Sequence, residues 1–215
     1  MFASRSMHED GISQEIEQLL DDPEFAIKIA IIGSPSTGKT CLVHRFAKSA
    51  FLENASPSTE TTVHPVNVEI NDRQVKEELW DIVGIKSPKE EEKRKLQYLG
   101  VMTFVICFDL AKESTFMDAI NHWIPECKRY FPDTPIIMCG TKMDLVENDL
   151  EVGQQHCKRF HSFESYNGIS KKYGCKTYLE VSAKESDISV VKLFATAIQT
   201  SLGMYKEDPK KCLLM

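Results

Sequence analysis

The feature that most constrains the fold is an apolar stretch, Ile29–Ile32, that leads directly into the sequence Gly-Ser-Pro-Ser-Thr-Gly-Lys-Thr. The fixed positions match the G-x-x-x-x-G-K-T pattern of a phosphate-binding loop between a strand and a helix. Glycines let the backbone approach phosphate oxygens, and the N–H groups of the loop and helix start point at the anion. The lysine adds a positive charge near the terminal phosphates, and the threonine hydroxyl suits Mg²⁺. The sequence therefore predicts a nucleotide-binding α/β fold.

Length and composition fit one domain with tails, because 215 residues of which 42% are hydrophobic can bury a full core. The formal charge of −6 argues against nucleic acid as a partner. No apolar run is long enough for a membrane span, and the first residues lack the apolar stretch of a signal peptide. Seven scattered cysteines without C-x-x-C pairs favour reduced thiols in a cytosolic protein.

Strands and helices alternate from Ala26 onward, which is typical of a mainly parallel sheet. Asn71-Asp72 indicates a hairpin turn, so one strand pair is expected to be antiparallel. The strand candidates are Ala26–Ile32, Thr62–Ile70, Val75–Trp80, Val101–Phe108, Ile136–Cys139 and Thr177–Val181. Helices are expected after Gly38, around Lys89–Leu99, over Ser114–Tyr130 and over Ile188–Met204.

The first 25 residues form an acidic N-terminal extension ahead of the expected domain. Four of its apolar residues fall on one helical face: Ile12, Ile16, Leu19 and Leu20. Two readings stay open for this segment. It forms a short helix that packs on the domain or docks a partner, or it is a frayed tail with a nascent helix.

A second motif, Trp80-Asp81-Ile-Val-Gly84, places an aspartate and a glycine at a strand end about forty residues after the loop. An aspartate there can hold Mg²⁺ through water, and a glycine N–H can meet a γ-phosphate. The motif is weak alone, but a phosphate-binding loop upstream strengthens it.

Two later motifs indicate recognition of guanine. In Gly140-Thr-Lys-Met-Asp144, the Asp144 carboxylate can accept both N–H groups of a guanine edge, which adenine does not offer. The stem of Lys142 can lie across the face of the base. In Glu180-Val-Ser-Ala-Lys184, the Ala183 N–H can donate to the guanine oxygen.

With these motifs in this order, the chain resembles a small GTPase of the Ras superfamily, and within it the Rho/Rac family. The likeness covers residues 26–204, and the wordings Lys39–Leu42, Leu79–Asp81 and Gly140–Leu145 are typical of Rho and Rac proteins. The resemblance implies a P-loop G domain with a six-stranded, mostly parallel sheet and about five helices. It also implies GTP, GDP and Mg²⁺ as ligands, a monomeric G domain, and exchange factors and effectors as partners.

The resemblance assigns further roles along the chain. Phe51 matches the aromatic residue that flanks the guanine, and Trp80 matches a position that exchange factors read. The segment 147–162 is expected to contain a Rho-type insert, because the chain there is roughly a dozen residues longer than in Ras or Rab proteins. The residues expected to contact the nucleotide are Gly33, Ser34, Pro35, Ser36, Thr37, Gly38, Lys39, Thr40, Cys41, Phe51, Thr59, Gly84, Thr141, Lys142, Asp144, Ser182, Ala183 and Lys184.

Two departures from the family concern catalysis. Pro35 stands where the family has glycine; it removes one N–H, fixes φ and adds bulk where an arginine finger must pass, unless it is a neutral variation. Ile85 replaces the glutamine that orients the attacking water, and its side chain has no donor or acceptor. Catalysis is then left to Lys39, Gly84 and Mg²⁺. We expect hydrolysis slowed by a factor on the order of 10².

A third departure lies in the segment that supplies the family's Mg²⁺-binding threonine. Ala55 stands at the place of the usual tyrosine, and one extra residue follows. Counting back from Asp81 favours Thr59 as the ligand, with Ser58 as the alternative. The expected metal ligands are therefore Thr40, Thr59 and, through water, Asp81.

Residues 205–215 form a tail that ends in Cys212-Leu-Leu-Met215, a C-a-a-X box for prenylation of Cys212. One prenyl chain with three nearby lysines gives marginal membrane binding. We expect a cytoplasmic protein that associates reversibly with the cytoplasmic face of a membrane, and a GDI-like prenyl-binding protein as a partner.

The sequence thus favours a prenylated Rho-family switch with slow hydrolysis. The alternative is a GTP-loaded binding module without turnover, comparable to the Rnd-type Rho proteins. An ATP-using kinase or ATPase is disfavoured by Thr141–Asp144.

Overall fold

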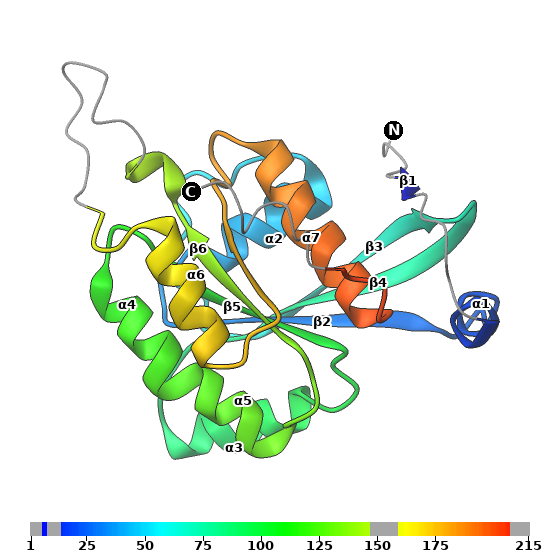
Figure 1. Ribbon diagram of the computed structural model, residues 1–215, viewed down its shortest axis with the longest axis horizontal. Helices are drawn as coiled ribbons and strands as arrows, with labels where there is room; N and C mark the ends of the chain where they lie inside the picture. Colours follow the sequence, from blue (N-terminus) through cyan, green and yellow to red (C-terminus); the bar gives the residue numbers. More distant parts are fainter. Residues whose placement is uncertain (1–5, 8–13, 147–158, 207–215) are drawn as a thin grey trace.

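The computed structural model describes residues 6–7, 14–146 and 159–206. Its centre is one twisted sheet with the strand order β1-β3-β4-β2-β5-β6-β7 (Figure 1). Among the described strands, β3 and β4 pair antiparallel and the other pairings are parallel. The strands are β1 (Ser6–Met7), β2 (Ala26–Ile32), β3 (Thr62–Ile70), β4 (Arg73–Asp81), β5 (Thr103–Asp109), β6 (Ile136–Thr141) and β7 (Thr177–Glu180).

The expected six-stranded, mostly parallel α/β sheet is confirmed, and each strand lies within two residues of its expected bounds. The leader adds to it the two-residue strand β1 beside β3, which the sequence did not suggest. The hairpin turn is also confirmed. Asn71 and Asp72 have φ of 48° and 61°. Both values belong to the two-residue turn whose twist matches an antiparallel pair.

Helices cover both faces of the sheet (Figure 1). Their bounds are α1 (Gln14–Leu20), α2 (Lys39–Lys48), α3 (Pro88–Gln97), α4 (Glu113–Asp118), the π-helical turn η1 (Ala119–Trp123), α5 (Ile124–Tyr130), the 3₁₀ turn η2 (Met143–Leu145), α6 (Phe163–Lys172) and α7 (Asp187–Ser201). The four helical stretches expected from the pattern are all present. Helix α6 was missed, because it is only ten residues long, contains Gly168 and buries only Tyr166 and Ser170.

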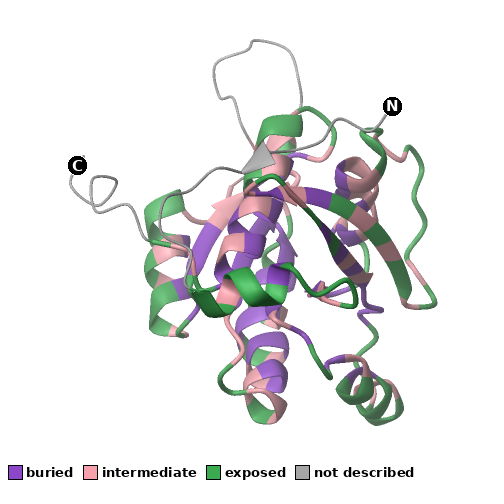
Figure 2. Ribbon diagram, turned by 90° about the vertical axis from the view of Figure 1, so that its right-hand side faces the viewer, coloured by how far each residue is buried: buried purple, intermediate pink, exposed green. Residues whose placement is uncertain are grey.

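Two apolar cores lie on opposite faces of the sheet, and Figure 2 shows buried residues along the strands and the inward sides of the helices. On one face, Leu42 of α2 and Phe194 of α7 pack against β2 and β5. On the other face, Trp123 of η1 and Tyr166 of α6 pack against β5 and β6. Every residue of β5 is buried, as expected for a central parallel strand covered on both sides. This arrangement fixes the carboxyl ends of the strands, where the site lies.

The leader packs on the domain, which decides between the two readings of the sequence. Leu20 is buried in the core that α2 and α7 cover, and Ile16 packs against the same cluster. Arg73 Nε lies 2.7 Å from Asp21 Oδ1 and ties the end of the leader to β4. Leu19 was expected on the buried face, but it is 45% exposed, and Ile12 lies outside the described residues.

Two expected segments fall mainly outside the described residues. Residues 147–158 of the expected insert and residues 207–215, with Cys212, are not described. The last insert residues, 159–162, lead into α6, and Ser162 caps that helix by accepting from Ser165 N–H. In the described part of the chain, no helix has the length and apolar character of a membrane span.

Candidate nucleotide site

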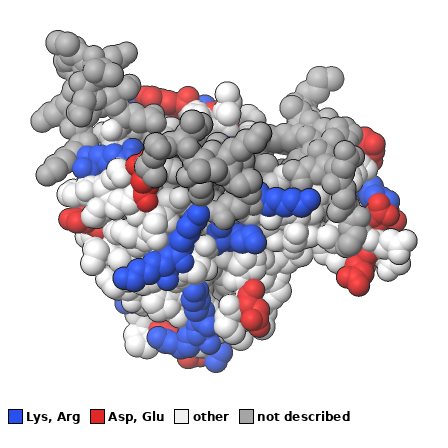
Figure 3. All heavy atoms as spheres, in the orientation of Figure 1, with Lys and Arg blue, Asp and Glu red and all other residues white. Residues whose placement is uncertain are grey.

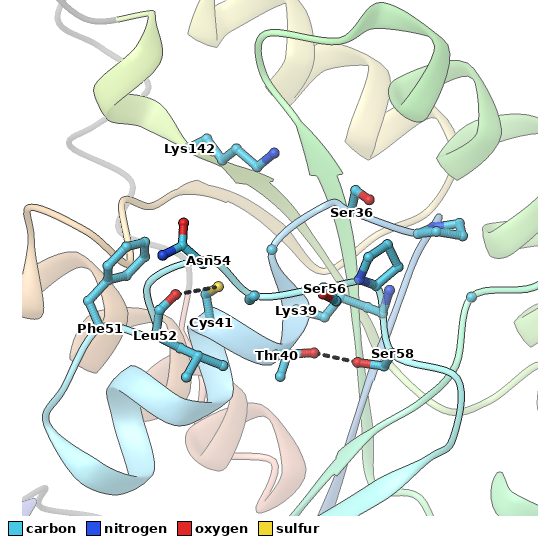
Figure 4. Close-up of a pocket in the computed structure, with 15 residues that line it drawn as sticks. Ser36, Lys39, Thr40, Cys41, Phe51, Leu52, Asn54, Ser56, Ser58 and Lys142 are labelled. Carbon is cyan, nitrogen blue, oxygen red and sulfur yellow. Dashed lines mark hydrogen bonds between the residues drawn. The ribbon is translucent and has the colours of Figure 1, made fainter.

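Two adjoining cavities open at the carboxyl ends of β2, β5 and β6, with volumes of about 300 Å³ and 230 Å³. Gly38, Cys41, Phe51 and Lys142 line both cavities, so the two form one continuous hollow. Figure 4 shows the side chains around the larger cavity, with Phe51 at one end and Ser58 at the other. A ligand site in this position is typical of open α/β sheets.

The larger cavity is formed by the loop between β2 and α2, whose glycines are required by close backbone contacts. A Cβ at Gly33 would lie 2.2 Å from the Cys107 carbonyl oxygen, and one at Gly84 would lie 1.9 Å from the Gly33 carbonyl oxygen. Gly38 has φ of 85° where α2 begins, in the left-handed region that favours glycine. The loop therefore brings backbone N–H groups and the start of a ten-residue helix to the cavity.

Lys39 lies folded inside the loop. Its Nζ donates to the carbonyl oxygens of Gly33 and Ser34 at 2.9 and 3.1 Å. Burial lowers the pKa of Lys39, and the Asp81 carboxylate opposes that shift. A buried ammonium held by neutral carbonyls gains most from an anion, so this residue fits a phosphate ligand.

Three oxygen-bearing side chains meet beside Lys39. The Thr40 hydroxyl donates to Asp81 Oδ2 at 2.6 Å and lies 2.7 Å from Ser58 Oγ. Within the described residues, Asp81 Oδ1 is buried without a hydrogen-bond partner. Burial raises the pKa of Asp81, against the effect of the Thr40 bond and the Lys39 charge. Hard oxygen ligands with an unsatisfied buried carboxylate oxygen fit a Mg²⁺ ion.

The geometry corrects the preference for Thr59 in this cluster. Thr59 is exposed and lines neither cavity, whereas Ser58 is half-buried and contacts Thr40 (Figure 4). Counting back from Asp81 favoured Thr59, but the hydroxyl that lies beside Thr40 is that of Ser58. The alternative that the sequence left open, Ser58, is the one that the structure favours.

The smaller cavity collects the residues expected at the base. Asp144 Oδ1 accepts from Ser182 Oγ at 2.6 Å, which orients the carboxylate. Thr141 Oγ1 donates to the Thr37 carbonyl at 2.6 Å and thereby joins this end of the site to the phosphate loop. Phe51, Ala183 and Lys184 complete the lining with Lys142 and Asp144.

Lys142 is held in place by a residue that the sequence analysis missed. Its Nζ lies 2.7 Å from Asp109 Oδ2, at the end of β5, and its φ of 58° is in the left-handed region. Asp109 could have been found, because it directly follows the apolar run Phe104–Phe108 at the same sheet edge as Asp81. Leu52 and Asn54 also line the larger cavity and carried no signal beyond their position beside Phe51.

Not every predicted residue points its side chain into the hollow. Ser34 Oγ donates to Asp118 Oδ2 at 2.6 Å, away from the cavities. Ile85 is 42% exposed, and its carbonyl accepts from Arg94 Nη1 at 2.6 Å. Pro35 lines the larger cavity as expected. At position 85 the chain therefore presents an alkyl group, which has no atom to hold a water molecule.

Comparison with known proteins agrees with this geometry. The sequence pattern of the Ras family matches residues 28–202. The chain is similar to human Rho-related GTP-binding protein RhoE, with 29% identity over 95% of this chain and 85% of RhoE. It is 31% identical to the Rho-related protein racE of Dictyostelium discoideum, over 86% of this chain and 81% of racE. It is 32% identical to Ras-related protein Rab-19 of Xenopus laevis, over 92% and 89% of the two chains.

Proposed function

Because the chain belongs to the Ras family, we propose that it is a Rho-related GTP-binding protein that serves as a GTP/GDP switch in signal transduction. One observation carries the proposal: a continuous hollow joins Lys39 and Thr40 at one end to Asp144 at the other. The two ends carry the groups needed for a phosphate chain and for a guanine base, respectively.

Guanine selectivity rests on the Asp144 carboxylate, which accepts from the two N–H groups of the guanine edge. Ser182 and Lys142 fix the geometry of that end of the site. The direct test is calorimetry on protein stripped of nucleotide, in buffer with Mg²⁺. We expect heat with GDP and GTP and none with ATP; heat with ATP alone, or with none of the three, would overturn the proposal.

Mg²⁺ would be held by Thr40 and Ser58 directly and by Asp81 through water. When bound, the ion neutralises charge on the β- and γ-phosphates. Lys39 would bind the same phosphates, and Gly84, which lines the larger cavity, would donate its N–H to the γ-phosphate.

Hydrolysis is proposed to be slow. Ile85 provides no group to orient the attacking water. Pro35 lines the larger cavity and would add bulk where an arginine finger must pass. The charges of Lys39 and Mg²⁺ remain, so a rate on the order of 10² below a well-assisted relative is expected.

A second candidate is a binding module that holds GTP without turnover. Ile85 and Pro35 favour it, and the likeness to RhoE extends over 95% of the chain. Single-turnover hydrolysis separates the two. Phosphate release that depends on Mg²⁺ supports the switch, and intact GTP in the purified protein after prolonged incubation supports the module.

The proposed partners are exchange factors, effectors and a GDI-like prenyl-binding protein. Trp80 is available to an exchange factor only in part, because Lys28 Nζ lies 3.6 Å from the centre of its ring. The cytoskeleton and membrane traffic are the proposed settings, by analogy with Rho-related proteins. A pull-down with the GTPγS-loaded protein tests whether Rho effectors bind it.

Membrane association is proposed to depend on prenylation of Cys212, in the C-a-a-X pattern of the tail. Figure 3 shows Lys and Arg side chains across the middle of one face, with fewer Asp and Glu side chains among them and along the margins. Such a face would add a weak attraction to anionic lipids. Cys212→Ser should move the protein to the soluble fraction of cells, whereas Cys157→Ser should not. Membrane recovery of the Cys212 variant would refute the anchor.

A further inference from the structure

The segment after Gly84, residues 85–97, is here called switch II, and a buried arginine joins it to helix α5. Arg94 of α3 donates to Glu126 with Nε and Nη2, each at 2.7 Å, in a two-pronged contact. Its third nitrogen, Nη1, donates to the Ile85 carbonyl at 2.6 Å. The Tyr98 hydroxyl, just beyond switch II, donates to Glu126 Oε1 at 2.7 Å. Arg94 therefore holds the Ile85 backbone and α5 at once.

A second ionic contact joins switch II to the phosphate loop through Asp118, the last residue of α4. Asp118 Oδ1 accepts from Lys86 Nζ at 2.6 Å, and Oδ2 accepts from Ser34 Oγ at 2.6 Å. The Trp123 indole donates to the same Ser34 oxygen at 3.1 Å. One carboxylate thus ties the residue after Ile85 to the loop that would hold the phosphates.

The helix that carries these anchors is widened by one π-helical turn between Asp118 and Trp123. Ile124 N–H donates to the Ala119 carbonyl, and Pro125 has no N–H to continue the regular helical pattern. The residues on either side of the turn both reach Ser34. The wider turn therefore places Asp118 and Trp123 where both contact Ser34 of the phosphate loop, while Asp118 also contacts Lys86 of switch II.

The contacts that hold switch II are more numerous than the one that a γ-phosphate would add. That phosphate would contribute a hydrogen bond from Gly84 N–H. Displacing residues 85 and 86 would break the hydrogen bond from Arg94 to the Ile85 carbonyl and the partly exposed Lys86–Asp118 pair. Displacing α3 with them would also leave Arg94 or Glu126 as an unpaired charge, because both side chains are at least 98% buried. A ligand shifts a conformation only by its difference in affinity for the two states, so these contacts oppose a displacement of switch II by the nucleotide.

On the basis of the proposed function, we propose that Arg94 and Asp118 are positioning residues that hold switch II in one conformation in both the GDP and the GTP forms. Of the two segments, only residues 51–60, which include Ser58, then change conformation with the nucleotide. The Ser58 hydroxyl couples them to the phosphate site because it contacts Thr40. A partner that binds the exposed side chains of Ile85 and Leu96 would recognise both forms equally.

Hydrogen–deuterium exchange on the full-length protein, loaded with GDP or with GTPγS, tests this. Amides of residues 85–97 are expected to exchange within about twofold of each other in the two forms, while those of residues 51–60 differ by more. A difference above about fivefold in switch II of the native protein would overturn the proposal. Failure to retain either nucleotide would instead overturn the proposed function, on which this proposal rests.

Variants supply the second arm. Asp118→Asn and Lys86→Ala remove the partly exposed pair and should fold; Arg94→Lys keeps the charge but loses the two-pronged contact. Each is expected to raise exchange of residues 85–97 about fivefold in the GDP form and less in the GTPγS form. Lys93→Ala, which breaks only the exposed pair with Glu90 on the same helix, is the matched control and should change neither. Equal exchange in both forms of all three variants would contradict the proposal.

Discussion

The two ends of the nucleotide site differ in how far they follow the family pattern. The base end has the expected residues, and each contacts a neighbour: Asp144 contacts Ser182, and Thr141 contacts Thr37. The phosphate end keeps Lys39 and Thr40 but has Pro35 and Ile85 where the family has glycine and glutamine. The contrast teaches that the departures from the family pattern gather at one end of the hollow, so under the proposed function they would weaken hydrolysis more than binding.

The largest expected effect is at the base end. Asp144→Ala removes two charge-assisted hydrogen bonds to guanine, so GTP affinity should fall by about 10³-fold and the preference over ATP should be lost. Competition with a fluorescent GTP analogue measures this. Asp133→Ala, the same change at an exposed residue that lines neither cavity, is the control. Retained guanine selectivity in the Asp144 variant would break the assignment of this end.

The phosphate end is tested by restoring its missing group. Ile85→Gln supplies a side chain that can orient water and should raise the hydrolysis rate by about tenfold, since Pro35 remains. The double variant with Pro35→Gly should be faster still in the presence of an activating protein. Single-turnover phosphate release is the measurement, and an unchanged rate would remove Ile85 as a cause of slow hydrolysis.

A smaller effect is expected at the base end from removing the charge that holds Lys142. Asp109→Asn removes the charge that holds Lys142 but keeps a hydrogen-bonding side chain of the same size. Loss of the charged partner should speed GDP dissociation by about three- to tenfold, because the Lys142 stem is less well placed against the base. Dissociation of fluorescent GDP reports it. If the Asn variant releases GDP at the native rate, the contact does not position Lys142.

The smallest effect concerns the helix that supports the phosphate end. Burial lowers the pKa of His122, with Arg94 and Lys86 adding to the shift and Glu126 opposing it. A histidine with a lowered pKa contributes stability above its unfolded value of about 6.5, and that stability is lost as the pH falls through the folded value.

Urea unfolding at pH 7.5 and 5.5 measures this contribution. The native protein should lose more stability between the two than His122→Asn does. Equal losses would show that His122 does not titrate in this range.

Much of the fold could be predicted because local patterns carried it. Sequence patterns predicted the β2 strand, the loop after it and the Asn71-Asp72 turn, because backbone geometry requires glycine or turn residues at specific positions there. Helix α6 was not, because it is short, contains Gly168 and buries few side chains. Most residues of the site were named from motifs and from the family resemblance. The contacts of Asp109 with Lys142 and of Asp118 with Ser34 were not, because those partners are distant in the chain.

The sequence by itself determined the residue types of the site: the phosphate-loop pattern, an aspartate at position 144 after a buried strand, and an alkyl side chain at position 85. Only the tertiary structure decided which neighbour, Ser58 or Thr59, turns toward Thr40, and that Arg94 holds the Ile85 backbone. The reason is physical. Residue types follow from local chemistry, whereas side-chain direction and long-range ion pairs depend on how separate elements pack, and spacing along the chain does not record that packing.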